Sequence, residues 1–130
     1  MGSATAEGSG DDALKLTRLY TGGDGESHFE DLEIPLQDAG LVGRLSKLET
    51  ATGVVFRETD GDYDFDWHNA PRRQLVVMLG GGEVEIEIGD GSRRRLGPGE
   101  ILLAEDTTGR GHRSRAVDGR ARTSMFVTLD

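Results

Sequence analysis

The sequence predicts an all-β protein, a barrel or sandwich of short strands. Twenty glycines and three prolines in 130 residues divide the chain into short pieces that suit strands and turns better than long helices. About eight to ten of these pieces have strand character and are separated by turn residues, a spacing typical of barrels and sandwiches. A chain of this length forms one domain.

The chain begins with a segment that we do not expect to fold. Residues 1–12 are small and polar, and they cannot bury enough apolar surface to offset the entropy lost on ordering. We therefore expect a flexible tail followed by a single domain over residues 13–130. The stretch LKLTRLY, which starts at Leu14, predicts a first strand that ends at the turn cluster TGGDGES.

A second strand and a short helix are expected next. One face of the strand is formed by Leu32, Ile34 and Leu36. Leucines then recur at helical spacing over residues 41–48, within a segment that two glycines interrupt. This segment indicates at most a short helix.

The second half of the chain reads as a series of strands. The segments GVVFRE, LVVML, VEIEI, SRRRL, ILLA, RSRAV and TSMFVTL are each bounded by turn residues. Alternation in VEIEI is the plainest: it directs Val84, Ile86 and Ile88 inward and Glu83, Glu85 and Glu87 toward water.

Composition excludes several classes of partner. Fifteen Lys and Arg against 24 Asp and Glu give a net charge of −9, which disfavours nucleic acids and anionic membranes. The chain has no Cys, so disulfides and thiolate chemistry are excluded. It has neither an export signal nor a run long enough to span a membrane, so we expect a cytoplasmic protein that binds a small molecule. The basic run of residues 93–95 reads as a solvated strand face or a dimer contact.

Three histidines are the candidates for imidazole chemistry. His28 reads as a hydrogen-bonded structural residue, whereas His68 and His112 lie at the ends of expected strands, where a closed sheet brings both to one interior. Strand alternation then places Arg72 and Gln74 on the same side as His68. Trp67, Asn69 and Arg73 fall on the opposite side.

The segment around His68 resembles the first motif of the cupin superfamily, small jelly-roll barrels built as a double-stranded β-helix. That motif runs His-x-His, three or four residues, Glu, six residues, Gly, and its counterparts here are His68, Ala70, Gln74 and Gly81. The first His is kept. Ala70 stands in place of the second His, and Gln74 in place of the Glu.

The segment that leads to His112 resembles the second cupin motif, which runs Gly, five residues, Pro-x-Gly-x-x-His. Its counterpart is GPGE, at residues 97–100, followed by TTGRGH, in which His112 keeps its place and Thr107 stands for Pro. Ala116 replaces the Asn that usually follows. The resemblance covers residues 54–129 and implies an all-β, double-stranded β-helix or jelly-roll cupin barrel.

The resemblance implies a site in the barrel mouth that usually holds a transition metal on three His and one carboxylate. Here His68 and His112 remain as metal ligands, Gln74 offers an amide oxygen and Ala70 offers nothing. A neutral set of this kind binds hard divalent ions weakly unless His28, Glu58 or Asp66 joins it. The expected cofactor is therefore none, or a weakly bound divalent transition metal.

Without a metal, the same residues suit acid–base catalysis. The unperturbed pKa of His, about 6.5, allows His68 and His112 to divide the roles of general acid and general base. Arg72 would bind a carboxylate, a phosphate or a developing enolate, and Gln74 would orient the substrate by a hydrogen bond. These four form the predicted catalytic set.

Three further residues are predicted to contact the substrate. Trp67, the only tryptophan, lies beside His68. The polar loop EDTTGRGH contains Asp106 and Thr108, and it reads either as a pocket lid in which one of them orients His112 or as a plain turn.

Three functional hypotheses remain open at this point. The first is a small-molecule enzyme of isomerase, cyclase or lyase type, which acts through histidine acid–base chemistry. The second is a metal-dependent oxygenase or lyase with its ion on His68 and His112, and the third is a non-catalytic cupin that binds a small ligand. The resemblance also implies a homodimer that pairs through its sheets.

Overall fold

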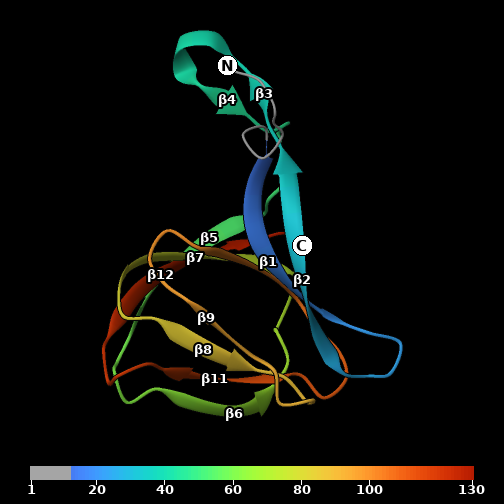
Figure 1. Ribbon diagram of the computed structural model, residues 1–130, viewed down its shortest axis with the longest axis vertical. Coiled ribbons are helices and arrows are strands. Elements are labelled where there is room, and N and C mark those ends of the chain that lie inside the picture. Colours follow the sequence, from blue (N-terminus) through green and yellow to red (C-terminus); the bar gives the residue numbers. More distant parts are fainter. Residues whose placement is uncertain (1–12) are drawn as a thin grey trace.

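The structure is a computed structural model that describes residues 13–130, and two β-sheets facing each other make up its body (Figure 1). The six-stranded sheet has the order β2 (Ser27–Pro35), β1 (Ala13–Thr21), β10 (Ile101–Glu105), β7 (Gln74–Gly81), β12 (Arg122–Thr128) and β5 (Gly53–Thr59). The four-stranded sheet has the order β6 (Asp64–His68), β11 (His112–Ala116), β8 (Val84–Glu87) and β9 (Arg93–Leu96).

The chain crosses from one sheet to the other repeatedly. From β5 onward, strands of the six-stranded sheet (β5, β7, β10, β12) alternate along the sequence with strands or a hairpin of the four-stranded sheet. Sequence neighbours therefore lie on opposite walls, which is the jelly-roll arrangement. The predicted all-β jelly-roll fold is confirmed.

The core fills part of the space between the sheets. Leu19 of β1 has an exposed fraction of 0%, and it clusters with Leu102 and Ala104 of β10. The opposite wall contributes Val84 and Ile86 of β8, whose predicted inward orientation is confirmed.

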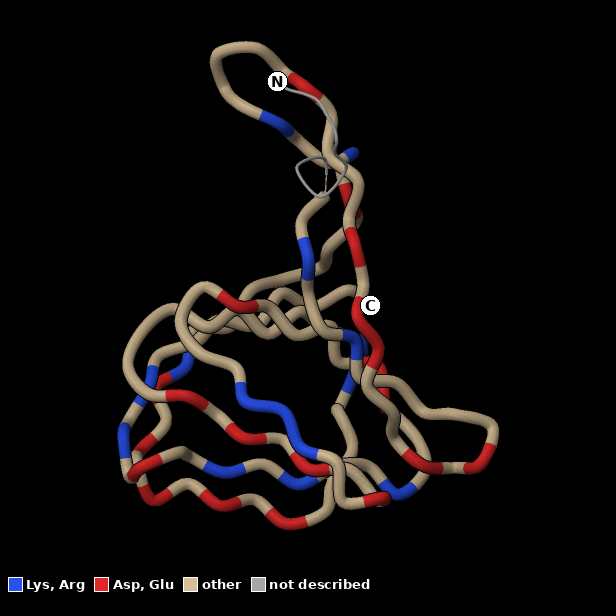
Figure 2. The backbone as a smooth tube through the Cα atoms, viewed as in Figure 1, with Lys and Arg blue, Asp and Glu red and all other residues tan. Residues whose placement is uncertain are grey.

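Glu85, however, does not face open water as the alternation predicted. It points away from the core, but only 8% of it is exposed because two arginines of the flanking strands cover it. Arg115 of β11 donates to Oε1 at 2.6 Å and Arg95 of β9 donates to Oε2 at 3.2 Å. Acidic and basic strands thus alternate across the outer face of this sheet (Figure 2), a pairing across strands that alternation within one strand does not reveal.

The short helix expected over residues 41–48 is also wrong. A hairpin of β3 (Gln37–Asp38) and β4 (Arg44–Leu45) encloses a single 3₁₀ turn, η2 (Gly40–Val42), and projects beyond the barrel (Figure 1). Gly40 and Gly43 have φ values of 72° and 98°, which place them outside the right-handed helical region. The glycines that interrupt the leucine pattern thus form the hairpin turn instead.

The sequence also predicted a flexible tail at the start of the chain and no segment that spans a membrane. The expected tail, residues 1–12, lies outside the described residues. Within residues 13–130, no helix has the length and apolar character required to span a bilayer.

We predict that Leu19→Ala destabilises the protein by about 2–5 kcal/mol, because it opens a cavity in the fully buried part of the core. Leu14→Ala, on the same strand but 46% exposed, is the matched control and changes stability much less. Urea denaturation followed by circular dichroism measures both. Equal losses for the two variants would contradict this placement of the core.

Candidate functional site

A cavity of about 430 Å³ lies between the two sheets, a size typical of small-ligand sites. Its walls are largely apolar, with side chains from both sheets. Polar groups enter it in two sets: His68, Asn69, Gln74 and His112 form one, and Arg57, Tyr63, Ser114 and Arg122 form the other.

A β-bulge in β6 turns His68 into this cavity. His112 pairs with His68, whereas Ser114, two residues further along β11, pairs with Phe65, three residues back along β6. The extra residue places Phe65 and His68 on the same face, where strict alternation would separate them. Their rings stack at a centroid distance of 3.7 Å and an angle of 8°.

Asp106, which does not line the cavity, forms a hydrogen bond with His112. Its side chain has an exposed fraction of 0%, and its Oδ2 lies 2.6 Å from Nδ1 of His112 and accepts a hydrogen bond from the Ser27 hydroxyl at 2.7 Å. Because a carboxylate can only accept, Nδ1 of His112 carries the hydrogen and Nε2 is the remaining basic nitrogen. Asp106 therefore fixes both the orientation of this imidazole and the position of its hydrogen.

His68 has the same tautomer for a different reason. Its Nδ1 lies 2.6 Å from the backbone carbonyl oxygen of Asp66, an acceptor only, so Nδ1 donates and Nε2 holds the lone pair. The rings of His68 and His112 lie 4.4 Å apart. Within residues 13–130, neither Nε2 has a hydrogen-bond partner.

Burial lowers the pKa of His68 below its usual 6.5, because removal from water disfavours the charged imidazolium. The nearby His112 lowers this pKa further. The backbone carbonyl of Asp66 and the charge of Asp106 raise it in part. His68 is therefore mainly a neutral base at pH 7.

Gln74 lies in the cavity wall as predicted, but the alternation argument that linked it to Arg72 is wrong. Residues 69–73 form a bend between β6 and β7, which belong to different sheets, so alternation does not continue through them. Arg72 is exposed in this bend and does not line the cavity. Gln74 is buried because it begins an inward-facing row of β7.

Trp67 and Thr108 also lie outside the cavity. The bulge directs Trp67 to the outer side of β6, where guanidinium carbons of Arg110 and Arg113 lie 4.4 and 5.8 Å from its ring. Thr108 is exposed, and its carbonyl accepts hydrogen bonds from Thr21 and Asn69, so it anchors the loop. The prediction that both contact substrate is not supported by these positions.

Asp106 takes the orienting role that was one of two predictions for its loop. Its carboxylate contacts His112 and Ser27 and does not line the cavity, so the prediction of direct substrate contact is not supported. His28 lies outside the cavity, with Nε2 3.0 Å from the Asp24 carboxylate and its ring beside Tyr20.

Sequence reasoning missed the second polar set. Arg57 and Arg122 face the cavity from β5 and β12, where alternation places each on the less apolar side of its strand. Tyr63, just before β6, bonds through its hydroxyl to Ser114 Oγ at 2.7 Å. The signal in the sequence is the polar character of one face of β12, where Arg122, Ser124 and Thr128 are polar and only Phe126 is apolar.

The donors in the cavity do not fit a divalent metal ion. Within the described part of the chain, no cluster of three or more His, Cys, Asp or Glu is arranged to hold one. Oδ2 of Asp106 bonds Ser27 and His112, its Oδ1 is buried without a partner, and Asp106 does not line the cavity, whose charged lining residues are two arginines. Neither Glu58 nor Asp66 contributes a side chain to its lining.

We predict that the Cε1–H NMR signal of His68 titrates with a midpoint below 6.5, and that His112→Gln raises this midpoint. Because unfolding restores the ordinary pKa, the unfolded chain binds more protons, and the free energy of unfolding falls as the pH drops below about 6.5. His68→Gln reduces this loss. A midpoint at or above 6.5 would show that His68 is not desolvated.

Comparisons with known proteins give likenesses to solved structures only. No protein-family model matches the chain, and a search of curated proteins finds no significant match. A conserved protein of unknown function from Streptococcus pyogenes has 22% identity and a TM-score of 0.47, over 66% of this chain and 69% of that one.

Two further solved structures are similar over most of this chain. A protein assigned as ethanolamine utilization protein Q, from Salmonella typhimurium, has 13% identity and a TM-score of 0.45, over 90% of this chain and 97% of that one. The Cnp3 cupin domain of Schizosaccharomyces pombe has 12% identity and a TM-score of 0.40, over 92% and 85% respectively. In its strand order and the alternation of its strands between two facing sheets, this chain has a jelly-roll fold.

Proposed function

We propose that this protein is a small-molecule enzyme that transfers protons through His68 and His112, and that the reaction is an isomerisation. The observation that carries the proposal is the array of Asp106, His112 and His68 at the cavity between the two sheets. The Asp106–His112 contact measures 2.6 Å and the two imidazole rings lie 4.4 Å apart. An oriented base beside a second imidazole is a typical acid–base arrangement.

The two imidazoles suit different parts of a proton shift. His68 is desolvated and mainly neutral, so its Nε2 accepts a proton from the substrate. His112 has the Asp106 carboxylate behind it, which balances the positive charge whenever this imidazole carries a proton to be donated.

The position of both rings favours isomerisation over the other reaction types. The two imidazole rings belong to paired residues of neighbouring strands, so both would contact the same side of a bound molecule. Nε2 of neutral His68 removes a proton, and a His112 that starts protonated donates its Nε2 proton to a neighbouring atom, which leaves the substrate's composition unchanged. Proton exchange with solvent then restores both rings. Gln74 is placed to hydrogen-bond an oxygen of the substrate during this shift.

The charge of the cavity supports a reaction that needs no metal. Arg57 and Arg122 repel a divalent cation, and the Asp106 carboxylate is already bound. The apolar remainder of the wall excludes water, which strengthens hydrogen bonds to the reacting group.

Solvent deuterium exchange tests this function. The purified protein is incubated in D₂O with a panel of neutral ketones, hydroxyketones and oxo acids, and loss of C–H signals is followed by proton NMR. We expect exchange with at least one compound, and a rate lower by about 100-fold or more in His68→Gln, the typical worth of a general base. Asp106→Asn retains both imidazoles and lowers the rate less.

Two controls accompany this measurement. His28→Gln removes an imidazole outside the cavity and leaves exchange unchanged. Addition of a chelator also leaves it unchanged. If no compound exchanges, or if His68→Gln exchanges as fast as the wild type, the proposed function is wrong.

A further inference from the structure

The part of the cavity wall formed by β5 and β12 contains two arginines without a carboxylate partner. Arg122 of β12 is 3% exposed, and its Nε and Nη1 atoms are buried with no hydrogen-bond partner. Arg57 of β5 is half-buried, and its Nε donates to Ser124 Oγ at 3.2 Å. Within residues 13–130, neither guanidinium forms a salt bridge.

This pair differs from other arginines of the described chain. Arg18, Arg73, Arg94 and Arg115 each bond a carboxylate on the surface. Arg122, the most buried of them, has none. Burial of a charge is costly unless an opposite charge or hydrogen bonds compensate it, so an unpaired guanidinium in a cavity wall indicates a missing anion.

The two arginines lie on the same face of neighbouring strands and line the same region of the cavity. Arg57 pairs with Ser124 across the strands, so Arg122 is its diagonal neighbour, at a typical Cβ distance of about 7–8 Å on the same face of the sheet. Burial lowers the pKa of both side chains, and the charge of Arg57 lowers that of Arg122 further. Each is charged at neutral pH, and each repels the other until an anion binds.

The guanidinium groups of Arg57 and Arg122 lie next to aromatic rings and not next to carboxylates. The guanidinium carbon of Arg122 lies 4.9 Å from the ring centroid of Tyr63, and that of Arg57 lies 4.6 Å from the ring of Phe126. The ring faces stabilise each cation in part and hold it in position without neutralising it. A side-chain hydrogen bond with Tyr63 also favours the charged form of both arginines. Nε and Nη1 of Arg122 have no partner among the described residues and are left for a ligand.

We propose that Arg57 and Arg122 bind the oxyanion, a carboxylate or a phosphate, of a small and otherwise largely apolar ligand in this cavity. The apolar body packs against Val76, Met78 and Leu102, which line the cavity between the two polar sets. If the proposed function holds, this ligand is the substrate, and the substrate is then a small, largely apolar molecule with a carboxylate or a phosphate.

The strands set the length of such a molecule. Thr128 of β12 pairs with Gln74, at the histidine end, and Arg122 lies six residues earlier on the same strand. This stretch spans about 20 Å of backbone, and the long arginine side chains shorten the distance to be bridged. Side-chain contacts shorten the distance further, since the Arg122 guanidinium carbon lies 4.9 Å from the Tyr63 ring, that ring 6.3 Å from Phe65, and Phe65 3.7 Å from His68. A short carbon chain therefore separates the oxyanion from the reacting atoms.

Calorimetric titration with hexanoate, hexyl phosphate and hexan-1-ol tests the site. We expect one or both anions to bind the wild type at least about tenfold more tightly than the alcohol, the typical worth of a charge-assisted hydrogen bond. The tighter anion distinguishes carboxylate from phosphate. Arg122→Gln and Arg57→Gln each remove the preference for the anion and leave alcohol binding unchanged.

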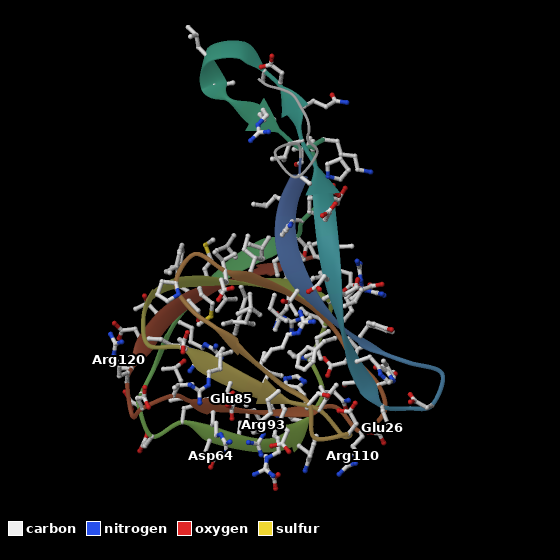
Figure 3. The ribbon with its side chains drawn as sticks, in the orientation of Figure 1. Glu26, Asp64, Glu85, Arg93, Arg110 and Arg120 are labelled. Atoms are coloured by element: carbon white, nitrogen blue, oxygen red, sulfur yellow. The ribbon has the colours of Figure 1, made fainter. Side chains whose placement is uncertain are left out.

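Arg120→Gln is the matched control. Arg120 lies two residues before Arg122, is exposed and projects from the outside of the barrel (Figure 3), so its loss leaves anion binding unchanged. The proposal is overturned if the alcohol binds as tightly as both anions, or if Arg122→Gln and Arg57→Gln bind them as the wild type does.

Thermal unfolding without ligand separates this role from a structural one. Arg122→Met removes an unpaired buried charge, so it unfolds at the same or a higher temperature than the wild type. A marked decrease would show that the protein itself satisfies Arg122, and would contradict the proposal. Neither measurement uses turnover: anion binding without deuterium exchange refutes only the proposed function, and exchange of neutral ketones without anion binding refutes only this inference.

Discussion

The site depends on one buried carboxylate. Asp106 follows β10 in the six-stranded sheet and bonds His112 at the start of β11 in the other sheet. The same oxygen accepts from Ser27 of β2, and the Asp106 carbonyl accepts from the Ala70 amide at 3.1 Å. This residue therefore joins both sheets and the bend after His68, so the positions of the two imidazoles and the closure of the barrel are set together.

The two polar ends of the cavity have complementary chemistry. Two imidazoles whose Nε2 atoms have no hydrogen-bond partner within residues 13–130 line the cavity at β6 and β11, and two arginines without a carboxylate partner line it at β5 and β12. A ligand with an anionic group at one end would bind in one orientation, with its other end at the imidazoles. Charge would then contribute to orientation, and the apolar wall between the ends to exclusion of water.

The sequence was a good guide to the fold and to the histidine end of the cavity. Turn spacing and the alternation in β8 predicted the barrel, and the cupin resemblance identified His68, Gln74 and His112, which the structure brings to one cavity. Alternation failed at Arg72 and Asn69, because residues 69–73 form a bend between strands of different sheets, through which the period of two does not continue. The arginine end was missed since hydrophobicity assigns the apolar face of a strand to the interior. In β5 the apolar residues Val54 and Phe56 face outward, and Arg57 faces the cavity.

The proposed chemistry depends on the hydrogen bond between Asp106 and His112, which a long-range ¹H–¹⁵N NMR spectrum of the histidine side chains at alkaline pH can detect. We expect His112 to carry its hydrogen on Nδ1 in this spectrum, and Asp106→Asn to change its pattern while the spectrum of His28 stays the same. A His112 with its hydrogen on Nε2 in the wild type would mean that Asp106 does not accept from Nδ1, and would contradict the arrangement from which the chemistry is derived.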